Sequence, residues 1–283
     1  MAETALVVVI DALGVETLRK HIGSARDSHP HLPNLSRMGL GNLLGKGYND
    51  ICEPTTKHDI ALEAAPSSVW SDSVMGHREL MGFIDPNDYR LFMEGFPAAF
   101  VNELEDRIGR PILFNKRAGG MEAIEINNSE HLRNGGVILY ASMCDPIAQF
   151  AADEKEISPQ DLEEIARTAF TLSQEHGVRL TRVITRPYES KEGRLTRTSN
   201  RRDVVLGMPP DVETFIDIAR RNGVYTVSIG KSADVVNTVW DCDRNLRGPL
   251  PTDLKSMYTM KRTDDKNPYS VREALGVLKD AKK

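Results

Sequence analysis

The sequence is poor in cysteine, in aromatic residues and in long apolar runs. Its three cysteines, Cys52, Cys144 and Cys242, are too widely spaced for a disulfide framework or a zinc site, so we expect reduced thiols. The longest apolar run near the start covers residues 5–10, which is too short to span a bilayer, and no basic flank of a secretory signal precedes it. These absences predict a cytoplasmic protein with no membrane partner.

A large excess of charge of either sign is also absent. The chain has 36 Lys and Arg residues against 41 Asp and Glu residues, which gives a net charge of −5. This balance argues against a general binder of nucleic acid or anionic membranes. The apolar share of 40% and the charged share of 27% are those of an ordinary globular protein, and 283 residues suffice for about two domains.

Strand and helix patterns alternate along the chain, which predicts an α/β fold. The β-branched run at 5–10 is typical of a strand buried on both faces of a parallel sheet. Further strands are expected at 137–141, 179–185 and 224–229. Helices are expected from Ser270 to the chain end and, each followed by a glycine, at 97–108, 158–176 and 210–222. Clusters of proline and glycine at 86–97 and 207–210 indicate two crossings to an inserted domain.

Positive charge is concentrated between residues 179 and 202, which hold eight basic and two acidic side chains. Arg182 and Arg186 lie on one face of the expected strand, and Arg197 follows in a loop, so their guanidinium groups could converge on one phosphate. A solvated basic hairpin is the alternative. Tyr188 is the only aromatic residue in this stretch, and base stacking needs aromatic side chains, so nucleic acid is the weaker interpretation.

Three other positions could carry chemistry. Asp11 follows the first expected strand at the sheet edge where α/β proteins bind ligands, and it could be a metal ligand or a helix N-cap. Ser73 stands four residues before His77, a spacing that fits a nucleophile but also a turn or a cap. Lys231 follows the strand at 224–229 in a segment that lacks the upstream glycine of a Walker loop, yet a lysine there could contact a phosphate.

The most specific motif is Asp72-Ser73-Val-Met-Gly76-His77-Arg-Glu79. Others are Val8-Val-Ile-Asp11-Ala-Leu-Gly14, Leu32-Pro-Asn-Leu35, Met38-Gly-Leu-Gly-Asn42, Tyr140-Ala-Ser142 with Asp145, Arg182-Val-Ile-Thr-Arg-Pro187, Arg197-Thr-Ser-Asn200-Arg201 and Ser228-Ile-Gly-Lys231-Ser-Ala-Asp234. In their order along the chain, these motifs resemble those of the phosphopentomutase family, part of the alkaline phosphatase superfamily, over nearly the whole chain. The family pattern at the first motif is Asp-Thr-x-x-Gly-His-Trp-Glu.

The resemblance implies an alkaline phosphatase-like core, incomplete in this chain, with an inserted α/β cap domain. The core would comprise residues 1–92 and 208–283, and the phosphosugar-binding cap residues 93–207. The family interconverts (deoxy)ribose 1-phosphate and (deoxy)ribose 5-phosphate through a phosphorylated enzyme, with two Mn²⁺ ions. On this resemblance Ser73 takes the phosphoryl group in place of the family's threonine, and Asp11 is a metal ligand. The pentose phosphate would be held by Ser142, Asp145, Arg182, Arg197 and Lys231.

The sequence departs from the family at Arg78, which replaces the tryptophan, and at its end. The family's later elements, Asp-x-Asp with Gly-His, Ala-Asp-His-Gly and Asp-His-Thr-Arg-Glu-His, have no counterpart here, and no histidine follows His176. Because two divalent ions need more donors than Asp11 and Ser73 supply, we expect an isomerase that is inactive unless a second chain supplies the C-terminal metal-binding half. The alternative is a noncatalytic phosphosugar-binding or regulatory protein, and a phosphate-ester hydrolase would need the same metals.

Overall fold

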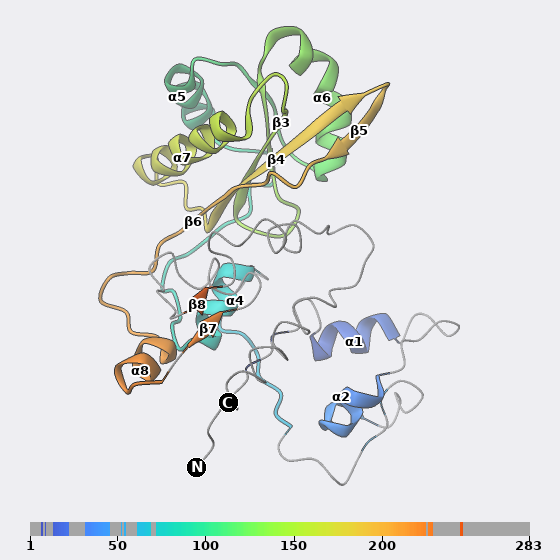
Figure 1. Cartoon of the computed structure of the whole chain (residues 1–283), viewed down its shortest axis with the longest axis vertical. Coiled ribbons are helices and arrows are strands. Elements are labelled where there is room, and N and C mark those ends of the chain that lie inside the picture. The colour runs from blue at the N-terminus through green and yellow to red at the C-terminus, as the bar shows by residue number, and fades with distance from the viewer. Residues whose placement is uncertain are drawn as a thin grey trace. The chain divides into compact units, whose positions relative to one another are not determined.

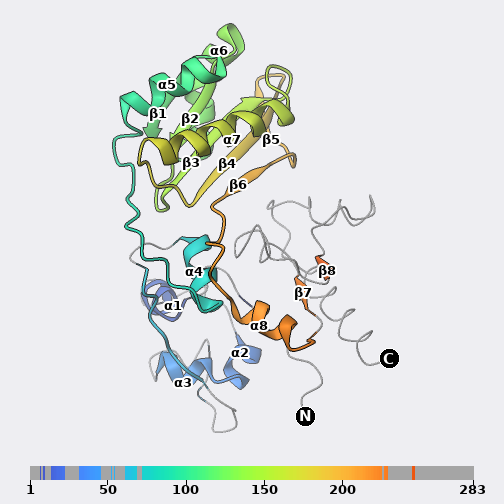
Figure 2. The same ribbon diagram turned by 90° about the vertical axis from the view of Figure 1, so that its left-hand side faces the viewer.

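A computed structural model describes residues 7, 9, 14–22, 32–45, 52, 54, 61–68, 72–224, 226–228 and 244–245 (Figures 1 and 2). The chain divides into two compact units, residues 1–66 and 67–283. The described helices of the first unit are α1 (Val15–Ile22), α2 (Pro33–Arg37) and α3 (Leu40–Leu44). They pack through Leu18 and Leu44, which are buried with Cys52.

The second unit is built around a mixed sheet of six strands. These are β1 (Ile112–Arg117), β2 (Val137–Ala141), β3 (Ile147–Asp153), β4 (Arg182–Lys191), β5 (Arg194–Arg197) and β6 (Asp203–Val205). The strand order is β1-β2-β3-β4-β5, and β6 pairs with β4 along the same edge as β5. The β1–β2 and β3–β4 pairs are parallel, and the other pairs are antiparallel.

Helices cover both faces of this sheet. On one side lie α5 (Ala98–Ile108) and α7 (Pro159–Glu175), and on the other lies α6 (Gly120–Asn134) (Figure 1). The larger core forms under α5 and α7, where Phe100 and Leu162 meet Phe150 of β3. A smaller core under α6 joins Ile124 to Tyr140 of β2. The sheet therefore sits between two apolar layers.

Four short elements of the second unit lie outside this layered part: α4 (Ser73–Leu80), α8 (Phe215–Arg221), β7 (Val227–Ser228) and β8 (Arg244–Asn245). Val74 and Met75 of α4 are buried against Tyr89. Val205, the last residue of β6, and Leu206, which follows it, pack against the same cluster. This contact joins α4 to the segments that lead into and out of the sheet. None of the described helices has the length and apolar character needed to cross a bilayer.

The predicted α/β class is confirmed, and several elements match their predictions closely. The strand at 137–141 is β2, with the predicted bounds. The helix expected at 97–108 is α5, which ends at Gly109 in the left-handed region with φ 63°. The helix expected at 158–176 is α7, whose first turn is capped because Ser158 Oγ accepts a hydrogen bond from Asp161 N at 3.1 Å.

Other predicted bounds are wrong or lie outside the described residues. The strand expected at 179–185 is β4, which begins at Arg182 and runs to Lys191 because β5 pairs with its far end. The helix expected at 210–222 begins only at Phe215, since Thr214 is its N-cap. Within the strand expected at 224–229 the described strand is β7. Of residues 5–10 only Val7 and Val9 are described, in irregular structure and exposed, so burial on both faces is not met there. The helix from residue 270 lies outside the described residues.

Candidate functional site

Ser73 is the first residue of α4, and it is half-buried. Asp72 precedes it as the N-cap, and Asp72 Oδ1 accepts hydrogen bonds from the backbone N–H groups of Val74 at 2.8 Å and Met75 at 3.0 Å. The N-terminus of a helix carries partial positive charge, so negative charge on Ser73 Oγ, or on a phosphoryl group bound to it, is stabilised there. Asp72, and not Ser73, therefore caps this helix.

Gly76 lies one turn after Ser73 on the same face of α4. Among the described residues, none has an atom within 4 Å of a Cβ added to Gly76. His77 is buried, and its Nδ1 lies 2.7 Å from the backbone oxygen of Ser73, to which it donates a hydrogen bond. The packed side of the helix is formed by Val74 and Met75.

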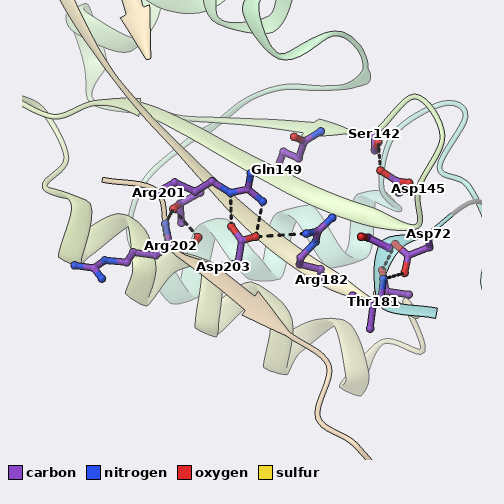
Figure 3. Close-up of polar contacts among 12 residues, drawn as sticks. Asp72, Ser142, Asp145, Gln149, Thr181, Arg182, Arg201, Arg202 and Asp203 are labelled. Carbon is purple, nitrogen blue, oxygen red and sulfur yellow. Dashed lines mark hydrogen bonds and ion pairs between the residues drawn. The ribbon is translucent and has the colours of Figure 1, made fainter. Parts of the chain in front are cut away.

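The N-terminus of α4 lies against the start of β4. Thr181 Oγ1 donates a hydrogen bond to Asp72 Oδ2 at 3.0 Å, and both residues are buried (Figure 3). Asp145, in the turn between β2 and β3, accepts a hydrogen bond from Ser142 Oγ at 3.2 Å. Burial raises the pKa of Asp145, and the nearby charge of Asp72 raises it further, while Arg182 lowers it. The residues predicted around Ser73 therefore share one corner of the second unit.

A row of paired residues crosses the sheet face that α6 covers in part. Its members, in register on β2, β3, β4 and β6, are Tyr140, Gln149, Ile184 and Asp203. Directly paired residues point to the same face, and so do residues two apart on one strand. Arg182 and Arg186, which flank Ile184 on β4, therefore lie on this face as predicted.

One carboxylate on this face meets two guanidinium groups. Asp203 Oδ1 accepts a hydrogen bond from Arg201 Nε at 2.6 Å, and Asp203 Oδ2 lies 3.6 Å from Arg182 Nη1 (Figure 3). Arg186 donates from Nε and Nη2 to Gln149 Oε1 at 3.1 and 3.0 Å. Burial lowers the pKa of Arg186 to about 10, with the positive charge of Arg201 as the next cause, so this group is still charged at neutral pH. Positive charge thus exceeds negative charge here, as anion binding requires.

Arg197, the last residue of β5, brings a further guanidinium group to the N-terminus of α6. A Cβ on Gly120 would meet Arg197 Nη2 and the Tyr140 hydroxyl, which places both groups beside the first residue of α6. Tyr140 is fully buried, and its hydroxyl has no hydrogen-bond partner among the described residues. A cation is unfavourable at the positive end of a helix. A bound phosphate would satisfy Arg197, the Tyr140 hydroxyl and the helix end together.

The rest of the basic segment points elsewhere. Arg202 Nε lies 3.7 Å from Glu163 of α7, on the opposite side of the sheet. Arg179 and Arg194 are exposed. The guanidinium groups on the α6 side are those of Arg182, Arg186, Arg197 and Arg201, which we call the arginine cluster.

The predicted site residues fall into three sets. Ser142, Asp145 and Arg182 lie together near Asp72, the chain neighbour of Ser73, and Arg197 lies at the N-terminus of α6. Asp11 and Lys231 lie outside the described residues. The sequence prediction did not assign a site role to Tyr140, Gln149, Thr181, Gly120 or Asp203. The alternation of side chains along β4 is enough to predict that Arg186 shares a face with Arg182. The pairing of β2, β3 and β6 that brings Tyr140, Gln149 and Asp203 to this face cannot be predicted from local sequence.

The described residues do not fit a two-metal site. Among them no group of three or more His, Cys, Asp or Glu side chains could hold a metal ion. The two carboxyl groups nearest Ser73 also have other partners, since Asp72 accepts three hydrogen bonds and Asp145 accepts one from Ser142. No reaction step can therefore be assigned to a metal on these residues.

Comparisons with known proteins identify relatives over most of the chain. The phosphopentomutase of Alkaliphilus oremlandii is 35% identical over 207 residues, which are 73% of this chain and 51% of the relative. The phosphopentomutase of Thermotoga maritima is 32% identical over 206 residues, which are 72% of this chain and 51% of the relative. No family model matches the chain. The chain spans about half the length of these relatives, and over the matched residues it belongs to the phosphopentomutase family.

Proposed function

We propose that this chain binds a pentose phosphate and carries the phosphoryl group in a phosphopentomutase reaction. In that reaction a phosphoryl group moves between the 1 and 5 positions of ribose or deoxyribose, with Ser73 as its carrier. One observation supports this most directly: the hydrogen bond from Thr181 to Asp72 ties the helix that begins at Ser73 to the strand that begins at Arg182.

The arginine cluster would hold the phosphate that does not react. Guanidinium groups bind phosphate through paired, charge-assisted hydrogen bonds. Here Arg182 and Arg201 pair with Asp203, and Arg186 interacts electrostatically with Arg197 as well as with Asp203. Asp145 and Ser142 would contact the sugar hydroxyls between the cluster and Ser73. Holding one end of the substrate raises the effective concentration of the other end at Ser73, which is the main contribution that binding groups make to such a transfer.

The proposal also includes groups that lie outside the described residues. Lys231 would contact the substrate phosphate, and Asp11 would be a ligand of Mn²⁺. Because the described residues do not hold a metal, the remaining ligands would come from a second chain that supplies the C-terminal half of the family's site. Bound Mn²⁺ would neutralise charge on the transferring phosphoryl group.

We also propose a cytoplasmic location, where the three cysteines would stay reduced.

The catalytic part is tested by conversion of ribose 1-phosphate to ribose 5-phosphate in the presence of Mn²⁺. The full chain is assayed alone and after co-expression with the adjacent reading frame. We expect turnover in the second preparation, complete loss in Ser73→Ala, and no loss in Ser129→Ala, an exposed serine of α6. Folded protein without turnover in either preparation contradicts a mutase.

The binding part is tested by calorimetry with ribose 5-phosphate and no metal. Loss of charge-assisted hydrogen bonds at Arg182→Ala should weaken binding about 10- to 100-fold. Ser73→Ala should bind as the parent chain does. Binding that follows this pattern without any turnover identifies a noncatalytic pentose phosphate-binding protein, because the arginine cluster lies within the described sheet and needs no metal ligand.

A further inference from the structure

Three hydrogen bonds, of which the one between Thr181 and Asp72 is buried, close a ring between α4 and the junction of β4 and β6. Thr181 Oγ1 donates to Asp72 Oδ2 at 3.0 Å, at the N-terminus of α4. The backbone oxygen of Thr181 accepts a hydrogen bond from Leu206 N at 2.9 Å. The backbone oxygen of Leu206 in turn accepts one from Arg78 Nη2, which returns to α4 near its other end. Thr181 and Arg78 have no exposed surface, and Asp72 is 4% exposed.

The buried guanidinium group of Arg78 is the costly member of the ring. Its Nε and Nη1 have no hydrogen-bond partner among the described residues, and the nearest carboxylate oxygen, Asp85 Oδ2, is 4.0 Å from Nη1. Burial lowers the pKa of Arg78. An apolar side chain of similar volume would pack here at a lower cost in free energy. Arginine adds two contacts here that an apolar side chain could not make, the hydrogen bond to Leu206 and the buried ion pair with Asp85.

Thr181 is placed to set the position of Ser73 relative to its neighbours. It directly precedes Arg182, and its backbone N–H donates to Pro146 O at 3.1 Å, next to Asp145 in the chain. One buried threonine thus contacts the cap of the Ser73 helix, the start of the arginine strand and the turn that carries Asp145. A small displacement of Ser73 from these groups would be enough to slow a transfer reaction.

We propose that Thr181 and Arg78 are positioning residues that fix α4, and with it Ser73, against Asp145 and Arg182. Thr181 holds the first turn of α4 through Asp72, and Arg78 holds its second half through Leu206. Neither residue is assigned contact with the substrate. The inference about transfer rests on the proposed function, whereas the inference about α4 does not.

The test compares Thr181→Val, which removes the hydroxyl at nearly constant shape, with Thr181→Ser, which keeps it. Hydrogen exchange at the amides of Val74 and Met75 is measured in the full chain, together with calorimetric binding of ribose 5-phosphate. We expect exchange to be about 2- to 10-fold faster in Thr181→Val and restored in Thr181→Ser, because the lost hydrogen bond is of ordinary strength. Binding should change less than 2-fold in both variants, since the arginine cluster stays in place.

Thr185→Val is the matched control. Thr185 lies within β4, four residues after Thr181, and is as buried as Thr181, but its hydroxyl bonds to the backbone of Arg202 and not to α4. Its loss should leave exchange at Val74 and Met75 unchanged. If the two valine variants speed exchange in α4 equally, or if neither does, the positioning role of Thr181 is wrong.

Turnover separates this inference from the proposed function. In the active preparation, Thr181→Val should lower kcat about 10- to 100-fold with KM nearly unchanged, and Thr181→Ser should recover kcat. An equal loss in both variants overturns the positioning role. If Thr181→Val does not fold, Arg78→Met takes its place, with faster exchange expected in the second half of α4 and recovery in Arg78→Lys. Absence of turnover in the parent chain counts against the proposed reaction, while the exchange results decide the role of Thr181 by themselves.

Discussion

Asp145 shows how opposing effects act on one side chain of the site. Burial and the charge of Asp72 raise its pKa, and the hydrogen bond from Ser142 and the charge of Arg182 lower it by less. The ionised carboxylate is therefore less favourable in the folded chain than in the unfolded chain. For an acid with a raised pKa, the contribution to stability is complete below the unfolded pKa and is lost as the pH rises through the folded pKa.

Asp145→Asn should consequently stabilise the chain at pH values where Asp145 is ionised. The amide oxygen keeps an acceptor for Ser142, and the ionisation that burial disfavours is gone. We expect a higher urea midpoint than the parent chain at about pH 7, and a difference that shrinks toward about pH 4. Asp211→Asn, at an exposed position, should show no such trend. A gap that widens on acidification would contradict the assignment.

Tyr140 and Tyr188 form a natural pair for comparison. Both are fully buried, but the Tyr188 hydroxyl donates to Asn128 Oδ1 at 3.0 Å, whereas the Tyr140 hydroxyl lies near the Arg186 guanidinium without a well-formed hydrogen bond to any described residue. An unsatisfied buried polar group costs about 1–3 kcal/mol, and an ordinary hydrogen bond contributes about 0.5–1.5 kcal/mol. The two hydroxyls should therefore affect stability in opposite directions.

Replacing each tyrosine by phenylalanine tests this difference. Tyr140→Phe should raise the free energy of unfolding by about 1 kcal/mol and weaken ribose 5-phosphate binding several-fold, because a ligand loses a donor. Tyr188→Phe should lower the free energy of unfolding by about 1 kcal/mol and leave binding unchanged. Urea unfolding and calorimetry give both quantities. Equal effects of the two changes on binding would remove Tyr140 from the anion site.

At the scale of elements, α4 contains Gly76 in its interior, a residue that lowers the stability of a helix. A glycine inside a helix costs about 0.5–1 kcal/mol relative to alanine because it loses more backbone freedom on folding. At Gly76 no packing contact with the described residues explains this cost, since none of them lies within 4 Å of a Cβ there. Gly76 shares its helix face with Ser73, so we expect a side chain here to interfere with a substrate bound at Ser73.

Gly76→Ala should therefore raise the free energy of unfolding by about 0.5–1 kcal/mol and lower turnover. The added methyl group would occupy space beside Ser73. Thermal unfolding and the mutase assay measure the two effects. Ser129→Ala, a helix-favouring change on the exposed side of α6, should add stability without loss of turnover. Unchanged turnover in Gly76→Ala would mean that the space has no role.

At the scale of the whole molecule, the buried residues that pack on the sheet come from one continuous stretch of the chain. Every buried residue of the two cores of the sheet lies between Phe96 and Tyr188. The strands that complete the sheet end at Val205. This stretch falls inside the proposed cap, residues 93–207, and its size is that of a common single domain.

Residues 93–207 expressed alone should consequently fold. We expect one cooperative urea transition and the dispersed amide spectrum of a packed α/β domain. Binding of ribose 5-phosphate should persist but be weaker than in the full chain, since Lys231 is absent. A fragment that shows no cooperative transition would contradict the proposed domain boundaries.

Local signals in the sequence were enough to find several elements. Gly109 and Ser158 mark helix ends because left-handed backbone and N-capping depend on residues close in the chain. The helix α6 was not predicted, because its buried side includes the polar Asn127 and His131, which blur the apolar periodicity. The extent of β4 was missed because its second half is fixed by pairing with β5.

The order of strand and helix patterns was sufficient to predict the α/β class, and local motifs were sufficient to predict the basic segment and Ser73 as functional groups. Which of these groups contact one another depends on the packing of the folded chain. The pairing of Tyr140, Gln149 and Asp203 across strands and the bond from Thr181 to Asp72 join residues far apart in the chain. Such contacts follow from sheet register and packing, which depend on the whole fold and not on any single segment.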